Sequence, residues 1–167
     1  MKTRLIIPLA HNPHVGVTNA YVMLFLCALL HLGETMHSHM VLGTNDIAES
    51  VAFYDRVMPV LGLSRQDTGE TYAGYGRSEH IDSGINCLSI AKPLNGEVAS
   101  VGNGLNVALL ATSRDQVGRF HALALDNGGT DDGASGLRNV HPNFYAAYML
   151  DPTGHKLVAV CHSAQTE

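Results

Sequence analysis

Basic side chains are scarce in this chain of 167 residues, which carries 10 Lys and Arg against 15 Asp and Glu and has a net charge of −5. The few Lys and Arg are scattered along the sequence. They form no basic stripe that could neutralise the phosphates of a nucleic acid. The composition therefore argues against a nucleic-acid partner and favours one globular domain with a core of its own.

Cysteine is also scarce. Cys27, Cys87 and Cys161 show neither the paired spacing of a disulfide framework nor the spacing of a zinc finger. Reduced thiols in a cytoplasmic protein are the simplest interpretation, because structural disulfides belong to oxidising compartments. Cys87 lies in the apolar run INCLSI and is expected to be a core residue rather than a nucleophile.

Long apolar runs are missing apart from AYVMLFLCALLHLG at 20–33. This run is short for a membrane span and His31 interrupts it, so no membrane partner is expected. No small-x-small cleavage site follows it, which argues against a signal peptide. Residues 1–35 are interpreted as an extension, either an upstream addition to a chain that begins at Met36 or an interface helix. A start at Met40 would remove His39.

Several common catalytic motifs are missing as well. The sequence contains no G-x-S-x-G elbow, no P-loop and no dinucleotide-binding fingerprint. Nucleophile-elbow hydrolases and the usual nucleotide-binding classes are therefore not indicated.

An internal repeat organises the rest of the chain. HMVLGTNDIAESVAFYDRVMPVLG (39–62) aligns without gaps with NVALLATSRDQVGRFHALALDNGG (106–129), at an offset of 67 residues. Each copy predicts a strand followed by a helix with a capping pair at its start. The capping pairs are Asp46 with Glu49 and Ser113 with Gln116. The predicted apolar stripes are Ile47, Val51, Tyr54 and Met58 in the first helix and Val117, Phe120, Ala124 and Leu125 in the second.

Three shorter strands are expected after each helix. They are placed at 63–68, 71–77 and 85–92 in the first half and at 129–132, 144–150 and 155–161 in the second. Each half then reads βαβββ, with module 1 at about 37–92, module 2 at about 104–162 and a Pro- and Gly-containing linker between them. The predicted fold class is α+β, in a single domain that spans 36–163.

Three phrases resemble the vicinal oxygen chelate superfamily of glyoxalases, extradiol dioxygenases and bleomycin-resistance proteins. SVAFYDRVMPVLGL is similar to the family's first helix, GNGLNVALLA to its fifth strand, and FYAAYMLDPTGHKLVAVCH to its closing hairpin. The resemblance implies two modules whose curved mixed sheets form a cup, with helices outside and a small-molecule ligand inside. It also implies a homodimer.

In metal-bearing relatives, a divalent ion such as zinc, nickel, manganese or iron is held by His or Gln on the first strand and Glu on the last strand of each module. The ion chelates two neighbouring oxygens of the substrate. Here the matching positions hold His39, Asn106, Val158 and either Ser89 or Ala91. Only His39 is a good ligand, so the resemblance implies a cup without the usual metal. A cluster of His37, His39 and His162 remains an alternative metal site.

A metal-free cup would bind an organic molecule through polar and aromatic side chains. The segment GASGLRNVHPNFY (133–145), expected to be a loop, supplies candidates beside glycines that let the backbone approach a ligand. An Arg there suits a carboxylate or phosphate group. The candidate ligand-binding residues are His39, Asn106, Arg138, His141, Asn143, Tyr145 and Val158. Packing within the loop or against a dimer mate is the competing interpretation of Arg138 and His141.

The favoured hypothesis is a small-molecule-binding protein of the glyoxalase and bleomycin-resistance group, without a cofactor. A divergent metal-dependent lyase or dioxygenase that uses His39 is the first alternative. A fold retained only for protein interaction is the second.

Overall fold

The computed structural model describes residues 37–80 and 87–165, all within one compact unit, His37–Glu167. Residues 1–36, 81–86 and 166–167 lie outside the described residues. The extension expected at 1–35 and the alternative start at Met36 fall there. None of the helices in the described part of the chain is long and apolar enough to cross a bilayer.

The first module runs through a strand, a helix and three further strands, as the repeat predicts. Its elements are β1 (His39–Gly43), α2 (Ile47–Val57), the 3-10 turn η1 (Met58–Leu61), β2 (Ser64–Thr68), β3 (Tyr72–Gly76), the short η2 (Ser78–His80) and β4 (Cys87–Ala91). The four strands lie in the order β1-β4-β3-β2. β1 pairs with β4 in parallel, and the other neighbours are antiparallel.

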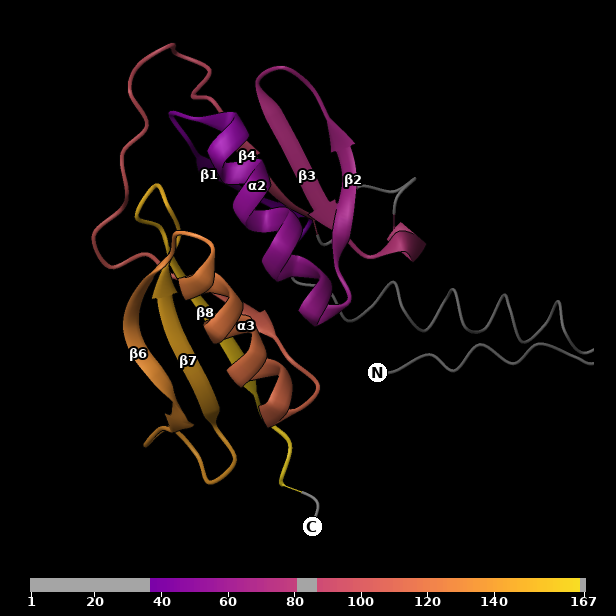
Figure 1. The fold of residues 1–167 in the computed structure, drawn as a ribbon, viewed down its shortest axis with the longest axis vertical. Helices are drawn as coiled ribbons and strands as arrows, with labels where there is room; N and C mark the ends of the chain where they lie inside the picture. Colours follow the sequence, from indigo (N-terminus) through magenta and orange to yellow (C-terminus); the bar gives the residue numbers. More distant parts are fainter. Residues whose placement is uncertain (1–36, 81–86, 166–167) are drawn as a thin grey trace, which may run out of the picture. The chain divides into compact units, whose positions relative to one another are not determined.

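The second module repeats this plan (Figure 1). Its elements are β5 (Val107–Leu110), α3 (Arg114–Asp126), β6 (Thr130–Leu137), β7 (Tyr145–Leu150) and β8 (Lys156–Cys161). The sheet order is β5-β8-β7-β6, again with a parallel pair at β5 and β8. Two mixed sheets, each built from a βαβββ module, confirm the predicted α+β fold class.

Both helices begin at the predicted caps. The Asp46 carboxylate accepts a hydrogen bond from the Glu49 backbone N–H at 3.0 Å, and the Ser113 hydroxyl accepts one from the Gln116 N–H at 3.2 Å. The Gln116 side chain does not bond back to the Ser113 N–H. Its Oε1 accepts instead from the backbone N–H of Thr112, one residue earlier. The capping residues therefore set the helix starts, while the return hydrogen bond to the Gln116 side chain comes from Thr112 instead of Ser113.

The apolar stripe of α3 differs from the prediction at one position. Val117, Phe120 and Ala124 are buried, whereas Leu125 is 37% exposed. The prediction for Leu125 is wrong because a helix turns about 100° per residue, which carries position 125 away from the face shared by the other three. In α2 the buried face is centred on Phe53, Tyr54 and Val57.

Each sheet has a helix face, which packs on the main core, and an outer face turned away from it. In β8 the side chains of Leu157, Ala159 and Cys161 belong to the main core. Val158 and Val160 form a second, smaller cluster on the outer face, together with Ala146 and the half-buried Phe144 and Tyr148. The alternation follows from the two-residue period of a strand.

β6 is longer than predicted. It extends through Leu137, so that 133–137 is strand rather than loop, and its pairing with β7 shifts register between Asp131 and Gly133 and again between Gly133 and Gly136. Glycines and register shifts weaken the alternating pattern by which a strand is recognised in sequence. The loop before β7 is therefore limited to 138–144.

A buried polar network joins the two modules. The Tyr54 hydroxyl of α2 donates to Asp151 Oδ2 at 2.7 Å, and Asp151 Oδ1 accepts from the backbone N–H groups of Gly154 and His155, each at 2.8 Å. His155 Nε2 in turn donates to the Gly43 carbonyl of β1 at 2.7 Å. Asp151 and His155 are almost fully buried, and their polar groups are satisfied across the junction.

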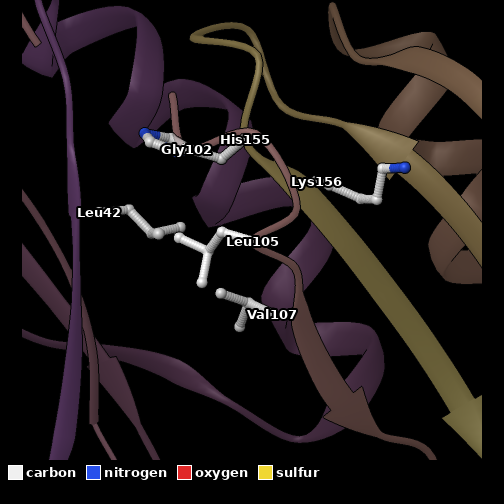
Figure 2. A pocket seen from close by; sticks show the side chains of 6 residues that line it. All are labelled: Leu42, Gly102, Leu105, Val107, His155 and Lys156. Carbon is white, nitrogen blue, oxygen red and sulfur yellow. The ribbon is translucent and has the colours of Figure 1, made fainter. Parts of the chain in front are cut away.

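A small cavity lies beside His155 (Figure 2). Leu42, Leu105 and Val107 meet around it, and the Lys156 side chain extends away from this apolar group. Its volume of about 10 Å³ is the space of a single water molecule at most. It is a packing gap at the junction and not a ligand site.

Candidate functional site

A larger cavity, of about 310 Å³, lies where the first strands of the two modules contribute to one surface. This volume is within the range of small-molecule sites. Its polar lining residues are His37, His39 and Arg77. The remaining walls are apolar or aromatic, formed by Met40, Leu61, Leu63, Tyr75, Leu88 and 108–110.

His39 is the predicted site residue that lines this cavity. It is the first residue of β1 and is exposed, and its Nδ1 lies 3.1 Å from the Ser38 hydroxyl. A contact to Nδ1 fixes the ring so that Nε2 is available to another group. His39 can therefore offer a hydrogen-bond donor or acceptor to a molecule in the cavity.

Arg77 contributes the charged group of the cavity. It follows β3 directly, and its Nη1 passes 3.7 Å from the point where a side-chain carbon on Gly62 would lie. Gly62 ends η1 with φ of 71°, a left-handed conformation that favours glycine. The guanidinium thus lies within van der Waals reach of the turn that ends η1.

Tyr75 forms an inner wall of the cavity and stays neutral. Its ring is buried, and its hydroxyl donates to Asp55 Oδ1 of α2 at 3.0 Å. Burial, and then the hydrogen bond to the Asp55 carboxylate, raise the pKa of Tyr75 well above its usual value. Tyr75 therefore adds aromatic surface without adding negative charge.

Strand register decides between Ser89 and Ala91, the two residues that the resemblance left open for the fourth metal position. Val41 of β1 pairs with Ser89 of β4, and Ala108, which lies 67 residues after Val41, pairs with Val158 of β8. Ser89 is therefore the first-module counterpart of Val158, and Ala91 is not. The four positions are His39, Ser89, Asn106 and Val158.

These side chains do not fit a divalent metal. Val158 has no donor atom, the Ser89 hydroxyl and the Asn106 amide are poor ligands for zinc or iron, and only His39 is a good one. In the described part of the chain, three or more His, Cys, Asp or Glu side chains nowhere converge as a metal site would require. His37 and His39 line the cavity, but His162 is bonded elsewhere, to His141.

The other predicted site residues gather on the second sheet. Arg138 lies with its guanidinium 5.3 Å from the centre of the Tyr148 ring, in a cation–π contact. Its Nη2 donates to the Ala134 carbonyl, and a side-chain carbon at Gly136 would come within 3.0 Å of Nη1. Gly136 thus leaves the Arg138 guanidinium room to approach the backbone of β6.

His141 and His162 form a pair at the end of β8. His141 Nε2 lies 2.8 Å from His162 Nδ1, and the Asn143 backbone N–H donates to His141 Nδ1 at 3.2 Å. Because Nδ1 of His141 accepts, its Nε2 carries the hydrogen and donates to His162. Phe144 contacts both rings edge-on. This arrangement anchors the loop before β7.

The remaining candidates lie apart from the cavity. Asn106 is exposed just before β5. Tyr145 packs against the main core on the helix face, under the Arg114 guanidinium, because it has the opposite parity to Val158. Val158 is on the face turned away from the helices, which the resemblance expects to line the cup, but it is only 3% exposed within the cluster that includes Phe144 and Tyr148.

Sequence reasoning missed Arg77, the charged residue of the cavity, and Tyr148, the partner of Arg138. Arg77 stands in no motif, and only the fold brings the residue after β3 and the start of β1 to one cavity. Tyr148 could have been found, because it shares the strand parity of Ala146 and pairs directly with Val158.

Comparisons with known proteins agree on one superfamily. Residues 37–158 match the family model for the Glyoxalase/Bleomycin resistance protein/Dioxygenase superfamily. A crystal structure of a glyoxalase/bleomycin resistance protein from Albidiferax ferrireducens T118 is 32% identical, with a TM-score of 0.69, and the match covers 77% of this chain and 100% of that one.

More distant structures share the fold. A glyoxalase-related enzyme from Fulvimarina pelagi is 17% identical over 74% of this chain and 86% of its own, with a TM-score of 0.58. A glyoxalase/bleomycin resistance protein/dioxygenase family enzyme from Burkholderia phytofirmans PsJN is 18% identical over 75% and 98%, with a TM-score of 0.57. No protein of curated function matches the chain.

Proposed function

The chain belongs to the glyoxalase/bleomycin resistance protein/dioxygenase superfamily, and from this premise we propose that it binds a small organic molecule in the cavity beside His39, without the superfamily's usual metal. The observation that carries the proposal is the composition of this cavity. Its volume is about 310 Å³, its walls are largely apolar, and it has three polar residues, His37, His39 and Arg77. Such a surface suits an organic ligand with a few polar groups.

The side chains at the four metal positions support the proposal that the site holds no metal. Of the four equivalent positions, only His39 carries a side chain that binds zinc or iron well, and Val158 cannot ligate at all. A cytoplasmic homodimer is part of the same proposal. Val41 and Leu110, both on the first strand of a module, are 57% and 62% exposed, and a second copy would cover such apolar side chains.

A fragment screen by ligand-observed NMR tests the binding role. Ala108 lines the cavity from β5, so Ala108→Phe fills part of its volume, whereas Ala122→Phe adds the same ring to an exposed position of α3. We expect fragments that bind the wild-type chain and the Ala122→Phe variant to lose binding to Ala108→Phe. Equal binding to all three proteins would place the ligand outside the cavity and overturn the proposal.

Elemental mass spectrometry decides between this proposal and a metal-dependent lyase or dioxygenase. The sample is untagged protein purified without chelator, beside a His39→Ala variant. We expect metal far below one equivalent in both samples, because His39 lacks partners with suitable donor atoms. About one equivalent of zinc, nickel, manganese or iron, lost in His39→Ala, would favour the enzyme instead.

A further inference from the structure

We propose that the cavity beside His39 selects a carboxylate-bearing apolar molecule and that Arg77 is the residue that binds the carboxylate. This inference rests on the proposed function, since it names the class of ligand for the same cavity. Its starting point is the sign of the lining charge. The three polar lining residues are all basic, and none of the lining residues is acidic.

Arg77 has no carboxylate partner among residues 37–80 and 87–165. The ion pairs of this part of the chain join Arg65 to Asp55, Arg119 to Asp115, His121 to Asp131 and Lys156 to Asp132. A guanidinium that forms no ion pair, beside an apolar surface, favours an anionic ligand because its N–H groups can make charge-assisted hydrogen bonds to it.

Among the described residues, Glu79 is a carboxyl group whose pKa the charge of Arg77 lowers. A hydrogen bond from its own backbone lowers the pKa of Glu79 most, and Arg77 adds to this effect. Glu79 is nevertheless exposed, lies outside the lining of the cavity and forms no ion pair with Arg77. It therefore leaves the guanidinium available to a ligand.

His37 and His39 extend the same preference. A neutral imidazole offers one N–H donor and a protonated one offers two, so both residues can donate to a carboxylate oxygen in either state. Arginine is suited to this role because its planar fork of donors matches the two oxygens of a carboxylate. The leucines at 61, 63 and 88 then contact the apolar part of the ligand.

Two probes that differ in charge alone test the inference. The probes are 2-naphthoate and its neutral analogue 2-naphthamide, titrated with the protein and followed by the fluorescence anisotropy of the naphthyl ring. The chain has no tryptophan, so the protein background is low. We expect the wild-type protein to bind naphthoate at least about tenfold more tightly than naphthamide, as a charge-assisted hydrogen bond provides.

Arg77→Gln should remove this preference and leave the affinity for naphthamide unchanged. The matched control is Arg119→Gln on the exposed surface of α3, where the arginine is already paired with Asp115 at 2.8 Å. The control should keep the full preference. A preference that survives Arg77→Gln, or that is lost equally in Arg119→Gln, would overturn the assignment of Arg77.

The outcomes also separate the inference from the proposed function. Equal binding of both probes to the wild-type protein, blocked by Ala108→Phe, would refute the carboxylate preference and leave the cavity as a ligand site. Failure of both probes to bind would refute the inference as well, and the fragment screen then decides on the cavity by itself.

Discussion

Removing the Tyr54 hydroxyl should destabilise the protein strongly, because it would break the hydrogen bond between the modules. Tyr54 is fully buried and donates to Asp151 Oδ2 at 2.7 Å, and Asp151 is 4% exposed. In Tyr54→Phe this carboxylate oxygen would remain buried without a donor. A hydrogen bond to a charged group contributes roughly 1.5–3 kcal/mol, so we expect the free energy of unfolding to fall by about 2 kcal/mol.

Urea denaturation followed by circular dichroism measures this change. The slope of unfolding free energy against urea should stay constant, since the surface exposed on unfolding is nearly the same. A loss of this size corresponds to a fall in Tm of roughly 8 °C for a domain of this length.

Tyr72→Phe is the matched control. The Tyr72 hydroxyl also donates to a carboxylate, Asp67 Oδ2 at 2.9 Å, but this pair is exposed and water can replace the lost bond. We expect a change below about 0.5 kcal/mol in this variant. If the two variants lose the same stability, the reasoning from burial is wrong. A double variant with Asp151→Asn measures the coupling directly, and additive losses would show that the two side chains do not act together.

Two further predictions concern glycine and pH. In Gly129→Ala the new Cβ would lie 2.7 Å from the Ala124 carbonyl oxygen, so we expect the free energy of unfolding to fall by about 2 kcal/mol in urea denaturation. In the control Gly118→Ala the new Cβ meets no atom within 4 Å, and the free energy of unfolding should rise by about 0.5–1 kcal/mol. A loss of stability in both variants would contradict this. Burial and a nearby carboxylate raise the pKa of Tyr54 and of Tyr75. The folded state thus holds these protons more tightly, and the stability they contribute is present below the tyrosine value of about 10 and lost as pH rises above it. Denaturation from about pH 8 to about pH 11 should show this fall, with a smaller slope in Tyr54→Phe; an equal slope in both proteins would argue against it.

Local sequence signals predicted the elements well where each position could be judged from its neighbours. Asp46 and Ser113 cap the helices as expected, and the strand parity of β8 places Val158 on the outer face. The errors arose where such signals were weak or misapplied. β6 was cut short because its glycines interrupt the alternation, and Leu125 was assigned to a buried face that the helical period does not reach.

The candidate site was only partly predictable. His39 could be found because the repeat and the resemblance both mark its position. Arg77 could not, since it becomes a lining residue only when the fold brings the end of β3 and the start of β1 to the same cavity. Arg138 and His141 lie in the loop between β6 and β7 and contact different partners, and neither lines the cavity that contains His39.

The sequence by itself determined the repeat and the two βαβββ modules, because periodicity and capping are local properties. Tertiary structure alone decided which distant residues meet. Tyr54 and Asp151 are 97 residues apart, and no local pattern records that they form a hydrogen bond. The same holds for the cavity, whose walls come from both modules and whose positive charge comes from Arg77, a residue that no local pattern places there. Contacts of this kind depend on how the modules pack, and packing is a property of the whole fold.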